Sequence, residues 1–214
     1  MDRPIDKLTG LTSGVELYAE MEKLIEKGKE FALIFIDIDN LFNLNRDFGH
    51  EAGDAVISMI AECVAENFPE PCLSFREARD EFAVLLPDGG KEKAFLKAEF
   101  LRINICGRKL DFLSADGTPL AQSVSIGVSS FPDDGNRPAD IYRRADSAMI
   151  RAKKNGRNAV CLAREEKLMP KTSHYTQAQL EKLSLISEKL AVGEAALLRE
   201  ALDDLLKKYD VNEI

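Results

Sequence analysis

The feature that most limits how this chain can fold is a six-residue apolar run, Phe31-Ala-Leu-Ile-Phe-Ile36, that ends at acidic residues. A short run without a polar interruption is typical of a strand that is buried on both faces of a sheet. Asp37 and Asp39 follow the run, and residues two apart in a strand point to the same face. We therefore predict a central strand whose end presents two carboxylates on one side of a sheet.

Helical and strand-like patterns surround this run. Apolar residues at three- and four-residue steps predict helices at residues 17–25, 56–64, 91–102 and 139–154. Ser13 and Glu16 fit a capping box before the first of them. Strand-like runs are expected at residues 72–75, 82–86, 124–128 and 159–162, with a turn at Asp116-Gly117. The first two runs flank a polar hexad and predict a hairpin. The result is an α+β fold with a central, mainly antiparallel sheet flanked by helices.

Charge and composition exclude several classes of protein. The formal net charge of −8 argues against a protein that coats nucleic acid by bulk electrostatics. The longest apolar run is far shorter than the roughly 20 residues of a membrane span, and no charged-then-apolar leader opens the chain. We expect a cytoplasmic protein without a membrane partner. The four cysteines show neither a CxxC pair nor zinc-ligand spacing, so we expect buried or half-buried free thiols.

The composition changes after Arg164, where a charged, proline-ended segment begins. We predict a first domain at residues 1–163, a linker at 164–170 and a second unit at 171–214. In the second unit an extended segment, 171–176, precedes two amphipathic helices separated by Val192-Gly193, and Thr176 with Gln179 fits a capping box. A unit of about 45 residues is too small to be stable alone, so we expect it to dimerise.

A second acidic pair, Asp80-Glu81, lies at the tip of the predicted hairpin. Neighbouring strand ends could bring this pair next to Asp37 and Asp39. Clustered carboxylates repel one another unless a hard cation lies between them, and Mg²⁺ prefers such oxygen ligands together with substrate phosphates. From the spacing alone, separate, solvated loop acids are the simpler interpretation.

Several strings together carry a more specific signal. They are Asp6-Lys-Leu-Thr-Gly-Leu11, Asp37-Ile-Asp39, Asn45 with Gly49-His50 and Gly53-Asp54, Asp80-Glu-Phe82, Ser125-Ile-Gly-Val128, and Ala145-Asp146, Ala148, Ala152-Lys153 and Gly156-Arg-Asn158. In this order and spacing they resemble the GGDEF domain of diguanylate cyclases, over about residues 5–163. The resemblance implies a palm-like fold and the joining of two GTP molecules into cyclic di-GMP, with one GTP held by each of two facing domains.

The resemblance also implies roles for individual residues. Asp37 and Glu81, with the Ile38 carbonyl, match the Mg²⁺ ligands, and Asp80 matches the acid that helps to deprotonate the attacking hydroxyl. Asn45 and Asp54 match the residues that read guanine, since a carboxylate suits the N–H donors of the base edge. Lys153 and Arg157 match the cations that bind phosphate, although solvated helix-end charges would give the same pattern.

The chain departs from the family at several of these places. The glycine pair of the signature is Ala78-Arg79 here, and glycine is needed where the backbone of a turn approaches a nucleotide. Arg79 could block the nucleotide or bind one of its phosphates. Phe42 stands where the family has a phosphate-binding lysine, Arg46 replaces an acid, and Ser13-Gly14 replaces Asn-Arg. The inhibitory Arg-x-x-Asp site is absent from Pro69-Glu-Pro-Cys72, so we do not expect feedback inhibition there.

The second unit resembles a ribbon–helix–helix DNA-binding unit, in which two chains pair their strands into a ribbon that enters the major groove. Alternation would point Lys171, Ser173 and Tyr175 toward DNA, with Thr172, His174 and Thr176 facing the helices. The expected dimer core consists of Leu180, Leu183, Ile186, Leu190, Leu197, Leu198, Leu202 and Leu205. Against DNA binding, residues 171–214 contain six Lys and Arg but eight Asp and Glu. A plain dimerisation or partner-binding module therefore stays open.

Three hypotheses about function follow. In the first, a degenerate GGDEF-type domain binds a guanine nucleotide with weak or no cyclase activity, coupled to DNA or partner binding by a homodimeric tail. In the second, the chain is a working, Mg²⁺-dependent diguanylate cyclase, and the tail holds two active sites face to face. In the third, it is a structural dimer without a nucleotide.

Overall fold

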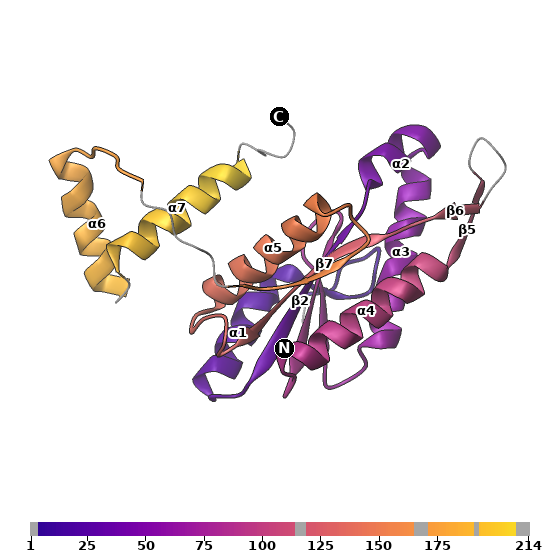
Figure 1. Ribbon diagram of the computed structural model, residues 1–214, viewed down its shortest axis with the longest axis horizontal. Coiled ribbons are helices and arrows are strands. Elements are labelled where there is room, and N and C mark those ends of the chain that lie inside the picture. Colours follow the sequence, from indigo (N-terminus) through magenta and orange to yellow (C-terminus); the bar gives the residue numbers. More distant parts are fainter. Residues whose placement is uncertain (1–3, 114–118, 165–170, 191–192, 209–214) are drawn as a thin grey trace. The chain divides into compact units, whose positions relative to one another are not determined.

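The apolar run forms β2 (Phe31–Ile38), and all eight of its residues are buried. It lies at the centre of a six-stranded sheet (Figure 1), paired antiparallel with β4 (Glu81–Pro87) on one side and β7 (Val124–Phe131) on the other. The other strands of this sheet, ordered β1-β3-β4-β2-β7-β8, are β1 (Thr12–Ser13), β3 (Leu73–Arg76) and β8 (Val160–Leu162). The pairs β1–β3 and β7–β8 are parallel, and the three other pairings in the sheet are antiparallel. The predicted mainly antiparallel sheet is confirmed.

The computed structural model describes residues 4–113, 119–164, 171–190 and 193–208. The chain divides into two units, Met1–Glu166 and Lys167–Ile214. We describe each unit by itself.

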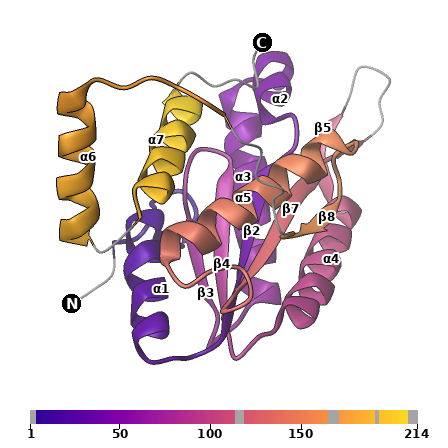
Figure 2. The same ribbon diagram turned by 60° about the vertical axis from the view of Figure 1, so that its left-hand side comes forward.

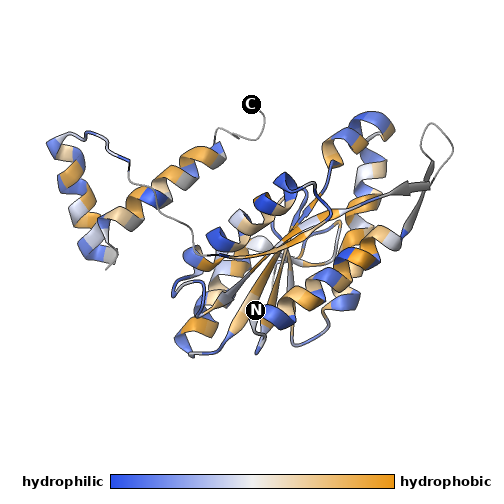
Figure 3. Cartoon of the chain, viewed as in Figure 1, coloured by the Kyte–Doolittle hydropathy of each residue, from blue (hydrophilic) through white to orange (hydrophobic). Residues whose placement is uncertain are grey.

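Helices cover both faces of the sheet because β2 is apolar on both. Phe31, Leu33 and Phe35 pack with α1 (Leu17–Glu26) and α5 (Pro138–Lys154). The alternate residues of β2 pack against the other layer, which contains α2 (Leu41–Phe48), α3 (His50–Asn67) and α4 (Lys91–Gly107). Figure 2 shows this layering, and Figure 3 shows the hydrophobic central strands between the helices. The period of two places Asp37 on the same face as Phe35, toward α5.

Close contact between α5 and β7 depends on one glycine. A Cβ at Gly127 would lie 1.9 Å from the Ala145 carbonyl oxygen and 2.4 Å from the Met149 nitrogen. Glycine therefore lets the α5 backbone lie directly against the sheet. The last turn of α5, which carries Lys153, is brought to the end of β2 in this way.

Most predicted elements are present, and the differences are in some of their ends and in one additional helix. The four expected helices correspond to α1, α3, α4 and α5, with α4 five residues longer at its end than predicted. The short helix α2 was not predicted. The expected capping box at Ser13 is wrong: Ser13 makes no capping hydrogen bond, and a 3-10 turn at Gly14–Glu16 precedes α1. Ser13 is instead a strand residue, because its backbone pairs with Arg76 of β3.

The predicted turn at Asp116-Gly117 lies outside the described residues, but β5 (Lys109–Leu113) and β6 (Pro119–Ala121) pair antiparallel on either side of it. The four cysteines are free, and Cys106 is exposed, contrary to the expected burial. Among the described residues, no helix combines the length and the apolar character that crossing a membrane requires.

The second unit contains α6 (Gln177–Leu190) and α7 (Glu194–Lys208). The predicted capping box at its start is present: the Thr176 backbone N–H donates to Gln179 Oε1 at 2.9 Å, and the Gln179 N–H donates to Thr176 Oγ1 at 3.3 Å. Residues 171–176 belong to no helix or strand in the single chain, and all six are exposed. The predicted inward face of Thr172, His174 and Thr176 is therefore not formed. A ribbon strand has backbone partners only when a second chain is paired with it.

Candidate functional site

The candidate site lies where β2 and β4 come together beside the end of α5. Asp37 of β2 and Glu81 of β4 are directly opposite in the antiparallel register. Directly opposite residues lie on the same face of a sheet, with Cβ atoms about 4.5–5.5 Å apart. The Ile38 backbone N–H donates to the Asp80 carbonyl at 3.0 Å, which holds the hairpin tip against the end of β2. The structure thus brings the predicted carboxylates of Asp37 and Glu81 together, and the charge of Asp80 acts on both of them.

Asp37 is only 2% exposed, and Lys153 Nζ lies 2.6 Å from its Oδ2 atom. Burial raises the pKa of Asp37 to about 7, although Lys153 acts in the opposite direction. Burial, the charge of Asp37 and the charge of Asp146 raise the pKa of Glu81 to about 7 as well. A positive charge bound between these two carboxylates would stabilise their ionised forms, so the raised pKa values indicate a site that a cation would complete.

The residues present fit a hard cation. Among the described residues, no group of three carboxylate, imidazole or thiolate side chains surrounds a common point. The available oxygen atoms are those of Asp37 and Glu81, with the backbone carbonyl of Ile38 between the two aspartates of β2. Asp37 Oδ1 is buried without a hydrogen-bond partner, so it has a free lone pair. Carboxylate and carbonyl oxygens are the ligands that Mg²⁺ takes, usually together with phosphate oxygens.

A second polar region lies on α2 and α3. Asn45 Oδ1 is buried and accepts no hydrogen bond. It rests against Gly53, where a Cβ would lie 1.8 Å from this oxygen, so only glycine leaves room for the amide. Asp54, the next residue, is exposed. An unpaired buried acceptor is costly, and a ligand with N–H donors would satisfy it.

The Ala78-Arg79 turn is held by an arginine that the sequence analysis did not single out. Arg76 Nε donates to the Ala78 carbonyl at 2.5 Å, and its guanidinium also donates to the Arg79 carbonyl. The same group lies over the Phe82 ring, 5.1 Å from its centroid. Neither Ala78 nor Arg79 has a positive φ, so the turn does not use a conformation that requires glycine. The Arg79 side chain itself is exposed.

The charge of Arg76 also links the hairpin to its surroundings, because Asp6, Asp80 and Asp54 all act on it. Burial lowers the pKa of Arg76, and these carboxylates oppose that effect. The predicted guanine-reading acid and the hairpin acid are thus within electrostatic reach of one cation. No single motif in the sequence signals this role, since Arg76 precedes the signature string.

Asp39 has a positioning role that the sequence analysis also missed. It is 2% exposed and accepts hydrogen bonds from the hydroxyls of Ser123 and Ser125, each at 2.7 Å, and from the backbone N–H of Asn158 at 3.0 Å. Arg157 and Asn158 both have positive φ, which is unusual for residues other than glycine. Asp39 therefore fixes the strained turn that follows Lys153. Arg157, the other predicted phosphate ligand, is exposed on this turn.

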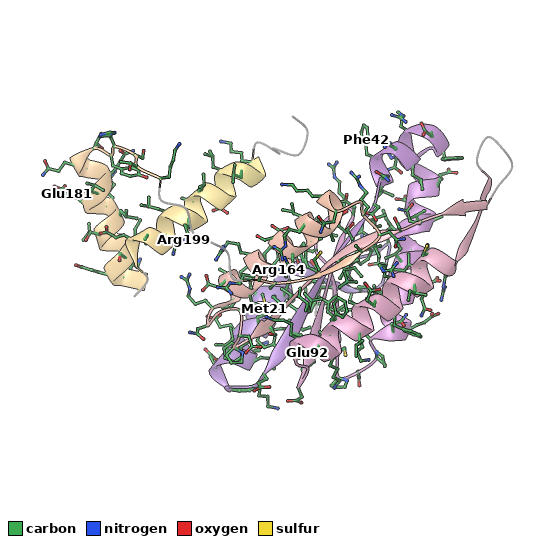
Figure 4. The ribbon with its side chains drawn as sticks, in the orientation of Figure 1. Met21, Phe42, Glu92, Arg164, Glu181 and Arg199 are labelled. Carbon is green, nitrogen blue, oxygen red and sulfur yellow. The ribbon has the colours of Figure 1, made fainter. Side chains whose placement is uncertain are left out.

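Gly14, one of the departures from the family pattern, lies against Glu77, which precedes the Ala78-Arg79 turn. A Cβ at Gly14 would lie 2.2 Å from Glu77 Oε2 and 2.8 Å from the Glu77 Cα. Gly14, where an arginine was expected, thus makes room for the carboxylate of the hairpin. Tyr142 of α5 donates from its hydroxyl to Glu77 Oε1 at 3.4 Å. Phe42 is 77% exposed at the start of α2 (Figure 4).

The residues predicted to contact DNA, Lys171, Ser173 and Tyr175, are exposed in the single chain. Several members of the predicted apolar core of the second unit are exposed as well: Leu180, Ile186, Leu202 and Leu205. The side chain of Leu190 lies outside the described residues. An apolar surface of this kind is typical of an interface.

Comparisons with known proteins identify the family of each unit. Residues 4–159 match the family model of the diguanylate cyclase GGDEF domain, and residues 168–210 match that of a ribbon-helix-helix domain. Response regulator PleD of Caulobacter vibrioides is 33% identical over 160 residues, which cover 72% of this chain and 35% of PleD. Diguanylate cyclase A of Treponema denticola is 32% identical over 65% of this chain and 37% of its own length. The chain thus spans about a third of the length of these relatives.

Solved structures show the same fold. The GGDEF domain of DgcB from Caulobacter crescentus, solved in complex with c-di-GMP, has a TM-score of 0.67 and 27% identity over 76% of this chain and 97% of its own. The active GGEEF domain of a diguanylate cyclase from Vibrio cholerae has a TM-score of 0.65 and 29% identity over 73% and 99%. The family model spans most of the chain, and the solved domains have its sheet and helices: this chain belongs to the GGDEF domain family of the diguanylate cyclases.

Proposed function

We propose that the first unit binds a guanine nucleotide in cyclic di-GMP signalling and that its cyclase turnover is weak or lost. The observation that carries nucleotide binding is the opposed pair Asp37–Glu81, with Lys153 2.6 Å from Asp37. This group combines oxygen ligands for a cation with a fixed positive charge. Binding of a nucleoside triphosphate needs both the cation and the fixed positive charge, because its phosphates carry several negative charges.

Recognition of guanine is supported by Asn45 and Asp54. The unpaired Asn45 Oδ1 accepts N–H donors, and the exposed carboxylate of Asp54 lies one residue beyond Gly53. Guanine presents two adjacent N–H groups on one edge, so two acceptors match it better than they match adenine. Mg²⁺ held by Asp37, Glu81 and the Ile38 carbonyl would neutralise phosphate charge. Lys153, and Arg157 on the turn fixed by Asp39, would hold the remaining phosphate oxygens.

Weak turnover is supported by the Ala78-Arg79 turn and by Phe42. The carbonyls of the turn are bound by Arg76, and the long side chain of Arg79 stands where the family has glycine. Phe42 supplies no charge at the position of a phosphate-binding lysine. Losing one charge-assisted contact costs about 1.5–3 kcal/mol.

Incubation with GTP and Mg²⁺, followed by separation of the nucleotides, tests this proposal together with calorimetry on a non-hydrolysable GTP analogue. We expect the analogue to bind and Glu81→Gln to weaken that binding, with little or no cyclic di-GMP formed. Robust product formation that disappears in Glu81→Gln would refute the weak turnover. No heat up to millimolar analogue would refute nucleotide binding and favour a purely structural dimer.

A working diguanylate cyclase is the second candidate, and one observation favours it. Asp37, Asp80 and Glu81 keep their expected places at the strand ends despite the altered turn. The chemistry also requires two nucleotides on facing domains, so activity would depend on pairing of two chains. The product assay above separates this candidate from the first.

For the second unit we propose pairing of two chains through α6 and α7, with DNA or a protein partner bound by the paired 171–176 segments. The exposed leucines of both helices support pairing, since burying them removes apolar surface from water. Lys171, Ser173 and Tyr175 would then face the partner. Sedimentation of the whole chain tests the pairing: we expect a dimer, and a monomer at every concentration would contradict it.

A further inference from the structure

Helix α4 is apolar on two sides. Its inner side carries Ala94, Ala98, Leu101 and Ile105, which are fully buried in the core of the first unit. The opposite side carries Leu96, Phe100 and Ile103, which are 68%, 60% and 57% exposed. These three residues, here called the α4 stripe, are spaced by four and three, so they form one line along the helix.

The α4 stripe is not explained by the fold or by the nucleotide site. A helix on the surface of a soluble domain normally turns charged and polar residues toward water. Here three large apolar side chains occupy the middle of the outer face, with Glu92 and Lys93 at its beginning (Figure 4). Contiguous exposed apolar residues rimmed by charges are typical of a surface that binds another protein.

We propose that the α4 stripe binds the α4 stripe of a second copy of this chain, with the two helices parallel. The spacing matches two heptads in which Lys93 and Phe100 occupy the a positions and Leu96 and Ile103 the d positions. In a parallel pair, each of these residues meets its own equivalent. Lysine at a single a position is a known means of fixing register in such pairs.

The charges beside the stripe favour a second copy in this orientation. Glu92 falls at a g position and Lys97, five residues later, at the following e position, and parallel helices bring these two positions together between chains. Each copy thus offers the other an acid and a base at matching places. In an antiparallel pair, the e positions of the two helices lie next to each other, so Lys97 of one copy would lie on the same side as Lys97 of the other. Lys97 now lies over the Phe68 ring, 5.5 Å from its centroid, and would exchange this contact for the carboxylate.

The contact is small, with three apolar side chains from each copy. It would be weak between free chains and much stronger between chains that are already held together, because tethering raises the effective concentration to the millimolar range. In this respect the inference rests on the proposed pairing of the second units. The test must therefore separate the two.

Disulfide trapping provides the test, in the whole chain with Cys106 and Cys161 changed to serine. Ile103→Cys is expected to form a disulfide between chains under mild oxidation, since d positions of a parallel pair come within the Cα separation of about 4.4–6.8 Å that a disulfide needs. Ile103 is exposed, so the change leaves the core intact. The matched control keeps Cys106 and Ile103 and changes only Cys161 to serine: Cys106 is exposed on the same helix at a g position and is expected not to cross-link.

A charge exchange tests the orientation independently. Glu92→Lys should slow trapping of Ile103→Cys several-fold, and the double change Glu92→Lys with Lys97→Glu should restore it. If Ile103→Cys fails but a chain carrying both Leu96→Cys and Phe100→Cys cross-links, the helices pair antiparallel, because antiparallel helices set an a position against a d position, and the proposal is wrong. If neither cross-links in a chain that sediments as a dimer, the stripe does not bind a second copy, while pairing of the second units stands. A chain that is monomeric and forms no disulfide contradicts both.

Discussion

At the scale of the residue, two arginines act on the same turn in different ways. Arg76 satisfies the carbonyls of Ala78 and Arg79 and stacks on Phe82, so it stabilises the turn from within. The side chain of Arg79 is exposed and adds bulk and charge on the outside. The altered signature therefore keeps an ordered hairpin and changes what the hairpin presents to a ligand.

Replacing Arg79 with glycine and Phe42 with lysine should strengthen binding of a GTP analogue about tenfold or more, because one charge-assisted contact contributes about 1.5–3 kcal/mol. Calorimetry on the double variant measures this. Arg46→Lys, a change that keeps the charge on the exposed face of α2, is the control and should leave the affinity unaltered. An unchanged affinity in the double variant would place the cause of weak function elsewhere.

Asp37 and Glu81 should make the first unit less stable as the pH rises. Their pKa values of about 7 exceed the ordinary values of 3.8 and 4.5, so the folded chain binds more protons than the unfolded chain between about pH 4 and 7. The stability of the first unit therefore falls as the pH rises through this window. Above about pH 7, these two groups cause no further change in stability. We expect Glu81→Gln to raise the thermal midpoint at pH 8 by about 3–6 °C and to flatten the pH profile.

Thermal unfolding between pH 4.5 and 8 without divalent cations checks this prediction. Glu51→Gln, an exposed change at the start of α3, is the control and should leave the profile as it is. At pH 8, Mg²⁺ should stabilise the unaltered chain and have little effect on Glu81→Gln. A wild-type stability that rises with pH would contradict the argument.

At the scale of the element, the site depends on how tightly α5 lies on β7. Asp134 supports this arrangement from the other end: it is 2% exposed, accepts a hydrogen bond from the backbone N–H of Ser130 of β7 at 2.8 Å, and lies 3.6 Å from the guanidinium of Arg144 of α5. Gly127 permits the close approach in the middle. Both contacts fix the position of α5, whose last turn carries Lys153 to Asp37.

Gly127→Ala should therefore destabilise the first unit by about 2–3 kcal/mol or more, since the new methyl group has no space between β7 and α5. It should also weaken binding of the GTP analogue, because the end of α5 shifts. Denaturant unfolding measures the first effect and calorimetry the second. Gly107→Ala, at a site with no atom within 4 Å, is the control and should be neutral or stabilising by up to about 1 kcal/mol. An equal effect of the two changes would show that the contact is unimportant.

At the scale of the whole molecule, the chain joins a GGDEF domain to a segment that matches a ribbon-helix-helix domain. The second unit has an acidic balance, so bulk electrostatics do not favour DNA, and any DNA binding must come from a few residues of the paired segments. This limits how strongly binding can respond to salt.

If the second unit binds duplex DNA, the logarithm of the affinity should fall with the logarithm of the salt concentration, by about 0.9 for each phosphate neutralised. Lys171→Ala should reduce this slope by about two, because each chain of a pair loses one phosphate contact. Lys189→Ala, in the last turn of α6, is the control and should not change it. If the DNA affinity of the unaltered chain does not change with salt concentration, the second unit binds a protein partner instead.

The sequence alone determined the central strand, the hairpin, every helix except α2 and the family, because these depend on local periodicity and on residue types at fixed spacing. It also singled out Asp37, Glu81 and Lys153, which lie together in the structure. It missed α2, the part of Arg76 in the turn, and Asp39 as the anchor of Asn158, and it assigned Ser13 to a cap that does not form. These depend on which backbone groups meet across long distances in the chain. Only the folded sheet decides that Ser13 pairs with Arg76, that Gly127 admits α5, and that α4 keeps three apolar side chains in water.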